Sequence, residues 1–167
     1  MRIEAIATNI NKKDATKYII SKIPLVSKVA PFNNLIGEVH LEYIEFKVLR
    51  YEIVSKKKSK KLFRKEINKY VITMLVNTHN GHSESIDKIP LTSRKYVTKS
   101  CIKRAKVNED DLIRGVKDEI IYFLNQKSTK DDFEKISIQN IIATEIKSIY
   151  KPYWVADFRG RSILIEA

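Results

Sequence analysis

Cys101 carries the most reactive side chain in the sequence, and three basic residues lie close to it, at Lys99, Lys103 and Arg104. Positive charge lowers the pKa of a thiol, which favours the reactive thiolate. A cysteine nucleophile also needs a base that orients it, and the sequence singles out no such base. We therefore expect no catalytic residue. An enzyme whose site combines dispersed residues, such as Cys101 and His82, stays an alternative.

His79 and His82 flank an Asn-Gly pair, and Glu84 or Asp87 could complete a set of metal ligands with them. Two histidines at a tight turn are more often exposed polar residues, so we expect neither a metal nor any other cofactor. The sequence contains no Walker A loop, no GxGxxG, no nucleophile elbow, no CxxC pair and no HExxH. These absences favour a protein that is not an enzyme.

Positive charge is the most informative feature of the composition, since the 167 residues carry a formal net charge of +12. Residues 47–69 hold ten basic and two acidic residues, and residues 94–106 hold six basic residues and no acid. Such segments attract polyanions and can contact phosphates. The predicted nucleic-acid contacts are Lys56, Lys57, Lys58, Lys60, Lys61, Arg64, Arg94, Lys103 and Arg104. The alternative is that the lysine-rich loop 56–64 is only a solvated loop of a lysine-rich protein.

The pattern of apolar residues predicts two helices that could position these groups. Asp14 is expected to cap a short helix that ends near Ile23. Asn108 and three following acids predict the start of a second helix, because acids are favourable at the positive end of the helix dipole. Its apolar residues recur at helical spacing as far as Asn125.

Apolar residues that alternate along the chain predict a strand over 38–55, with shifts of phase that indicate bulges. Apolar residues on both faces predict a central strand over 67–78. Asn80-Gly81 predicts a two-residue turn into a strand over 83–88. The lysine-rich loop would then join the first two strands of a three-stranded meander. Residues 135–150 are expected to form a strand because they are rich in Ile, although their spacing also fits a helix. A terminal hairpin is expected through Arg159-Gly160.

A possible internal repeat appears when residues 41–48 are laid over residues 148–155, because Tyr, an aromatic residue and Val recur in register. We expect one domain over 1–167, with related helix-plus-meander halves at 14–90 and 108–167. The predicted fold class is α+β, with a curved antiparallel sheet and one or two helices packed on it.

The segment Tyr150-Lys151-Pro152-Tyr153-Trp154 resembles a Tyr-x-Pro-Tyr-Trp element of bacterial α+β domains of unknown function, some fused to zinc ribbons or membrane segments. The resemblance brings no activity with it. The aromatic residues Tyr150, Tyr153 and Trp154 could line a ligand or peptide groove. The alternative is that Pro152 marks the end of a strand and that the aromatic rings belong to the core.

The leading functional expectation is a non-enzymatic protein-interaction module, with electrostatic nucleic-acid binding as the alternative. No apolar run is long enough to span a membrane, and the N-terminus lacks the apolar core of a secretion signal, so we expect a cytoplasmic protein. A single cysteine cannot form an internal disulfide, which agrees with a reducing compartment. A homodimer could form through a strand edge near Glu166-Ala167.

Overall fold

The structure is a computed structural model that describes residues 1–22, 37–58, 65–128, 141–158 and 160–167. These residues form helices α1 (Lys12–Lys22) and α2 (Glu109–Ser128) and a 3₁₀ turn, η3 (Lys99–Cys101). They also form the strands β1 (Arg2–Ile6), β2 (His40–Lys58), β3 (Lys65–Asn77), β4 (Ser83–Ser85), β5 (Thr92–Tyr96), β6 (Ile102–Lys103), β7 (Ile141–Phe158) and β8 (Arg161–Glu166).

The strands pair in the order β4-β3-β2-β7-β1-β5, while β6 pairs with β2 and β8 pairs with β7. Most of the pairs are antiparallel, and the β1–β7 and β2–β6 pairs are parallel. The structure therefore confirms an α+β protein with a mostly antiparallel sheet. The predicted curvature of the sheet stays a prediction.

The contacts within the chain define two compact units. The first unit consists of residues 1–45, 90–104 and 149–167, and the second of residues 46–89 and 105–148. Strands β2 and β7 contribute residues to both. The single domain over 1–167 and its related halves at 14–90 and 108–167 stay predictions.

In the second unit, α2 packs on strands β2 and β3 through the apolar stripe that the sequence predicts. Asn108 caps the helix, because its Oδ1 accepts a hydrogen bond from the backbone N–H of Asp111 at 2.8 Å. Tyr51 on β2 is fully buried, and its hydroxyl donates to the carbonyl of Ile113 at 2.9 Å. Burial raises the pKa of Tyr51 to about 12. This contact fixes the helix against the sheet.

The connection from β3 to β4 contains Asn80-Gly81, as predicted, but it is longer than a two-residue turn. The backbone N–H of Asn77 donates to the carbonyl of His82 at 2.8 Å, so residues 78–81 form the loop. Gly81 has a φ of 75°, a conformation that glycine adopts without strain. The strand that follows is β4, which is shorter than the predicted 83–88.

Strand β2 continues through Lys56, Lys57 and Lys58, which the sequence predicts to lie in a loop. Lys56, Lys57 and Lys58 pair with Ile67, Glu66 and Lys65 in the antiparallel ladder. The loop is therefore shorter than 56–64, because the ladder between β2 and β3 extends to the pair of Lys58 with Lys65. The predicted contacts Lys60, Lys61 and Arg64 lie outside the described residues, as do the side chains of Lys56, Lys57 and Lys58.

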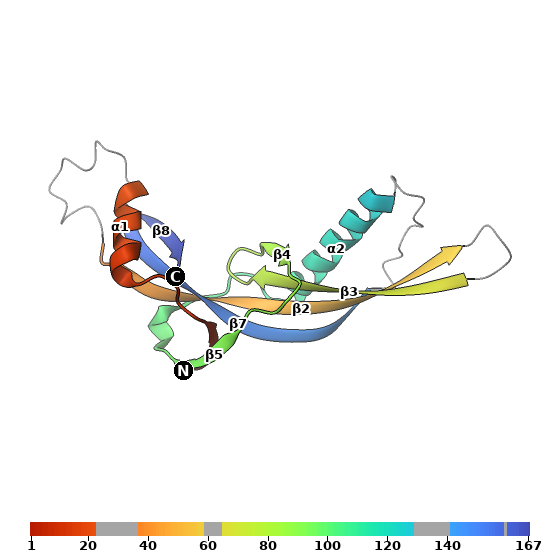
Figure 1. Ribbon diagram of the computed structural model, residues 1–167, viewed down its shortest axis with the longest axis horizontal. Helices are drawn as coiled ribbons and strands as arrows, with labels where there is room; N and C mark the ends of the chain where they lie inside the picture. The colour runs from red at the N-terminus through yellow and green to blue at the C-terminus, as the bar shows by residue number, and fades with distance from the viewer. Residues whose placement is uncertain (23–36, 59–64, 129–140, 159) are drawn as a thin grey trace. The chain divides into compact units, whose positions relative to one another are not determined.

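In the first unit, α1 begins one turn before the predicted position. Asn11 is the capping residue, since its Oδ1 accepts the backbone N–H of Asp14 at 3.0 Å. Asp14 lies inside the first turn and accepts a hydrogen bond from the Asn11 amide at 2.8 Å. Ile19 on this helix packs with Val39 and Ala156, and α1 lies beside β8 in Figure 1.

Strand β7 runs through Pro152, where the sequence analysis had placed the end of a strand. Proline lacks only the backbone N–H, and here the carbonyl of Pro152 accepts the N–H of Ala167 at 3.0 Å. The proline ring is fully buried. The ladder with β8 follows at once, from Tyr153 opposite Glu166 to Phe158 opposite Arg161, and forms the predicted terminal hairpin.

Candidate functional site

The outer edge of β5 is the strongest candidate for a functional site in the first unit. Strand β5 is the last in the sheet order, and within the described part of the chain it pairs only with β1. These two strands lie side by side in Figure 1 near the N-terminus. An unpaired edge offers a row of backbone donors and acceptors to another extended chain.

The register identifies the backbone groups that face away from β1. Met1 and Val97 exchange two hydrogen bonds, of 2.7 and 2.9 Å, so they form a hydrogen-bonded pair. In an antiparallel ladder such pairs alternate with pairs that exchange none. The outward groups of β5 therefore belong to the residues opposite Arg2, Glu4 and Ile6, which are Tyr96, Arg94 and Thr92. Among the described residues their backbone N–H and C=O groups have no partner.

Two large apolar side chains flank this edge and are left in solvent. Leu91 is 93% exposed and Tyr96 is 83% exposed. The opposite face of β1 and β5 is covered, because Ile3 and Ala5 pack in a core cluster with Tyr43. The other face of the two strands, which carries Glu4 and Arg94, is therefore the exposed one.

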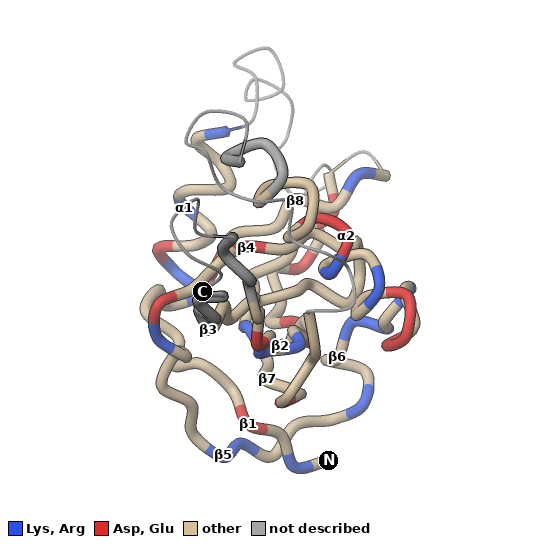
Figure 2. Tube along the Cα trace, turned by 90° about the vertical axis from the view of Figure 1, so that its right-hand side faces the viewer, with Lys and Arg blue, Asp and Glu red and all other residues tan. Residues whose placement is uncertain are grey.

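The basic segment 94–106 lies partly on β5 and partly on β6, and two of its predicted contacts are paired with acids. Arg94 Nε lies 3.3 Å from Glu4 Oε1, and Lys103 Nζ lies 3.2 Å from Glu42 Oε2. Arg104 is exposed after β6. Figure 2 shows basic residues along β5 and at the start of β1. The segment thus has charge at the open edge, where Arg94 is 68% exposed and contacts Glu4 through Nε alone, whereas Lys103 is largely buried beside Glu42.

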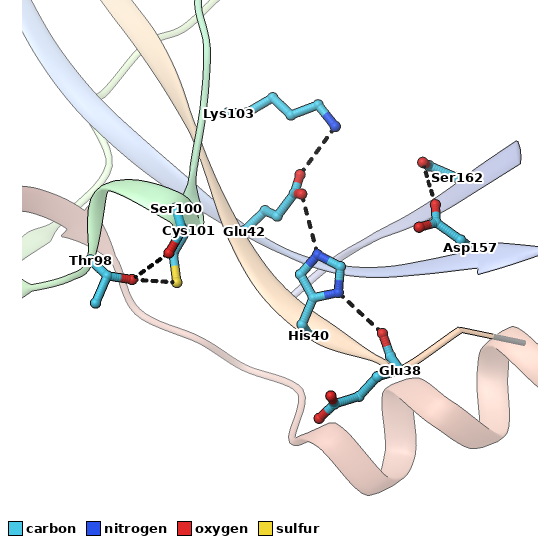
Figure 3. A network of polar contacts seen from close by, with 9 residues as sticks. All are labelled: Glu38, His40, Glu42, Thr98, Ser100, Cys101, Lys103, Asp157 and Ser162. Atoms are coloured by element: carbon cyan, nitrogen blue, oxygen red, sulfur yellow. Dashed lines mark hydrogen bonds and ion pairs between the residues drawn. The ribbon is translucent and has the colours of Figure 1, made fainter. Parts of the chain in front are cut away.

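A polar network around His40 was missed by the sequence analysis, and Figure 3 shows it. His40 Nδ1 lies 3.1 Å from the carbonyl of Glu38, and His40 Nε2 lies 3.3 Å from Glu42 Oε1. Glu42 Oε2 is buried, and its neighbour is the Lys103 ammonium in a contact that lacks hydrogen-bond geometry. Both ring nitrogens of His40 are engaged, so the network favours a structural role. The signal in the sequence was the i, i+2 spacing, which places His40 and Glu42 on one face of β2.

The pKa of His40 is raised above 6.5, first by the hydrogen bond to Glu38 and then by the one to Glu42. Asp157 raises it further through its negative charge, and partial burial opposes these effects. The carboxylate of Glu38 is itself paired with Lys12, at 3.2 Å.

Because the folded-state pKa of His40 is the higher one, protonated His40 stabilises the protein below pH 6.5. This contribution is expected to disappear as the pH rises through the folded-state pKa. The free energy of unfolding, measured with urea across that window, should fall more in the wild type than in His40→Gln. Identical pH dependence in the two proteins would contradict the assignment.

Cys101 lies in η3 and packs beside Tyr43, with Thr98 Oγ1 at 3.1 Å from its sulfur. Thr98 Oγ1 also lies 3.0 Å from Ser100 Oγ. The groups near the thiol are thus hydroxyls and apolar side chains. Burial is the main cause that raises the pKa of Tyr43, and its electrostatic interaction with Cys101 raises it further.

The aromatic residues proposed as a ligand groove pack in different places. Tyr150 packs against the cluster of Ile3, Ala5 and Tyr43. Trp154 packs against the cluster around Ile19, and its indole N–H donates to the carbonyl of Ile10 at 2.8 Å. Tyr153 is partly buried on β7. The structure therefore gives Tyr150 and Trp154 contacts in two separate clusters, and a groove that they share stays a prediction.

His79 and His82 lie in and just after the loop between β3 and β4, in the second unit. Their backbone N–H groups donate to the side chains of Asn77 and Asn80, at 2.8 and 3.0 Å. No group of three or more His, Cys, Asp or Glu residues among the described residues is arranged to hold a metal ion.

The chain matches no protein-family model, no curated protein and no solved structure. None of the helices in the described ranges has the length and apolar character needed to cross a membrane.

Proposed function

We propose that the protein is a non-enzymatic interaction module that binds an extended segment of a partner protein along β5. The observation that supports the proposal is the outer edge of β5, where the backbone groups of Thr92, Arg94 and Tyr96 have no partner among the residues that the structure describes. A segment that aligns with such an edge gains main-chain hydrogen bonds and adds a strand to the sheet. Each bond contributes about 0.5–1.5 kcal/mol net.

The exposed side chains at the ends of β5 support the same function. Leu91 and Tyr96 lie almost entirely in solvent, where large apolar groups contribute nothing to the core. Covering a side chain of this size yields about 1.5–3 kcal/mol. Tyrosine is also among the residues that most often dominate binding energy at interfaces. Backbone pairing along β5 and contacts at its two ends would act together.

The proposal can be tested without knowing the partner, by selecting binders from a phage library of random linear peptides. Peptides that bind β5 should slow amide hydrogen exchange at Thr92, Arg94 and Tyr96, because these N–H groups become donors in a new ladder. The amides of Ser93 and Lys95, which face β1, serve as the internal control. The proposal fails if no peptide is enriched, or if the enriched peptides protect other segments and leave β5 unchanged.

Electrostatic binding of nucleic acid through the lysine-rich residues 56–64 and segment 94–106 is the alternative proposal. It is supported by the net charge of +12. The pair Lys103–Glu42 weakens it at β6, because the Lys103 side chain is largely buried and already has an acidic neighbour. Affinity for nucleic acid falls steeply as salt rises, which distinguishes this function from backbone pairing. A cytoplasmic location is part of both proposals.

A further inference from the structure

We infer that the partner segment that pairs with β5 is acidic, an inference that rests on the function proposed above. Residues 88–106 contain seven basic residues and no acidic residue, and β5 lies inside this stretch. Like charges directly opposite one another destabilise a strand pair, so β5 disfavours a basic partner strand. An acidic strand would pair favourably with β5, because charges of opposite sign across a strand pair are stabilising.

Cations are available on both faces of β5. Arg94 lies opposite Glu4, on the face that points away from Ile3 and Ala5, and its side chain is 68% exposed. Only its Nε donates to Glu4, and its other guanidinium donors make no hydrogen bond with the described residues. Lys95 points to the other face, where its Nζ lies 6.0 Å from the centre of the Tyr43 ring. Because side chains alternate along a strand, acids on either face of the partner would meet one of these cations.

A second copy of the chain is a poorer occupant of this edge. Pairing β5 with itself in an antiparallel register brings Arg94 and Lys95 close to the same residues of the other copy. Like charges opposite one another destabilise a strand pair. Nucleic acid matches the charge of β5, but it cannot complete a peptide ladder with the outward groups of Thr92, Arg94 and Tyr96. An acidic peptide satisfies both the charge and the backbone.

Three synthetic peptides of equal length test the inference, with threonine alternating with Glu, Gln or Lys and with both ends blocked. We expect the Thr-Glu peptide to bind about tenfold more tightly than the Thr-Gln peptide, and the Thr-Lys peptide more weakly than either. The advantage of the Thr-Glu peptide should shrink as salt rises, because the charges lie at the surface.

A protein that carries both Arg94→Gln and Lys95→Gln is the matched control, because it keeps every backbone N–H group. It should bind the Thr-Glu and Thr-Gln peptides with similar affinity. Equal binding of these two peptides to the wild type, with protection of the outward β5 amides, would overturn the acidic inference and support strand addition. If no peptide, including any selected from the library, protects those amides, the proposed function itself fails. We also test whether oligouridine RNA displaces the Thr-Glu peptide from β5 at a concentration below that of the peptide. Such displacement would favour the nucleic-acid alternative and overturn the inference.

Discussion

Replacing Tyr51 with alanine is expected to lower the free energy of unfolding by about 3–5 kcal/mol, the usual cost of removing a buried aromatic ring. The Tyr51 side chain extends from β2 toward α2 and is fully buried, in one cluster with residues such as Leu112 and Val116. Its hydroxyl also donates to the carbonyl of Ile113, and this bond disappears with the ring. The change therefore removes packing and a helix contact together. Urea unfolding followed by circular dichroism measures the loss.

Two further variants separate these contributions. Tyr51→Phe keeps the ring and loses only the hydrogen bond to Ile113, so it should cost about 1 kcal/mol. Glu52→Ala changes the exposed neighbour on the same strand and should stay within about 0.5 kcal/mol of the wild type. A Tyr51→Ala protein as stable as Glu52→Ala would contradict the packing of α2 on β2.

The elements that could be predicted from the sequence are those with a long and regular pattern. Helix α2 repeats its apolar residues over several turns and begins after a capping residue, Asn108, so its start was correct. Most of the predicted stripe packs on the sheet, although Phe123, which was expected on it, is 53% exposed. Strand β3 contains a nearly continuous apolar run over residues 70–76 and is followed by a turn with a glycine at positive φ. In both, local propensity and tertiary packing favour the same structure.

The pair of β1 and β5 was missed for a physical reason. Each strand has only five residues, too few to establish a period, and Glu4 and Thr92 are 88 positions apart in the chain. A pair so distant in sequence is stabilised by tertiary contacts rather than by local pattern. Segment 94–106 was singled out for its charge alone, and its place at the edge of a sheet required the register with β1.

Pro152 shows how a correct rule can give an incorrect boundary. Proline is depleted inside strands because it cannot donate to a ladder. Pro152 stands at the end of the ladder with β8, where its carbonyl accepts from Ala167, and the pairs from Tyr153 onward are unaffected by the missing N–H. The orientation of a backbone group in a ladder cannot be read from the residue type. For the same reason, the residues of β5 whose backbone groups point away from β1 could not be predicted from the sequence.

The orientation of the β5 backbone also provides the sharpest test of the proposed function, a comparison of Arg94→Pro with Arg94→Ala. Both variants lose the side chain that contacts Glu4, and only the proline loses the outward N–H and fills the edge with its ring. The bonds between β5 and β1 belong to Ser93, Lys95 and Val97, so proline at position 94 should leave that ladder in place.

We expect Arg94→Pro to bind library-selected peptides about tenfold more weakly than Arg94→Ala, or not at all, because one hydrogen bond is lost and the ring obstructs the incoming strand. Isothermal titration calorimetry measures the difference. Amide exchange at Lys95 and Val97 in the free variants reports whether the pairing with β1 has survived. If it has, the difference between the two variants reflects the outward N–H of residue 94 and the space beside it. Equal affinity of the two variants, with that pairing intact, would mean that peptides bind by their side chains and that β5 does not receive an added strand.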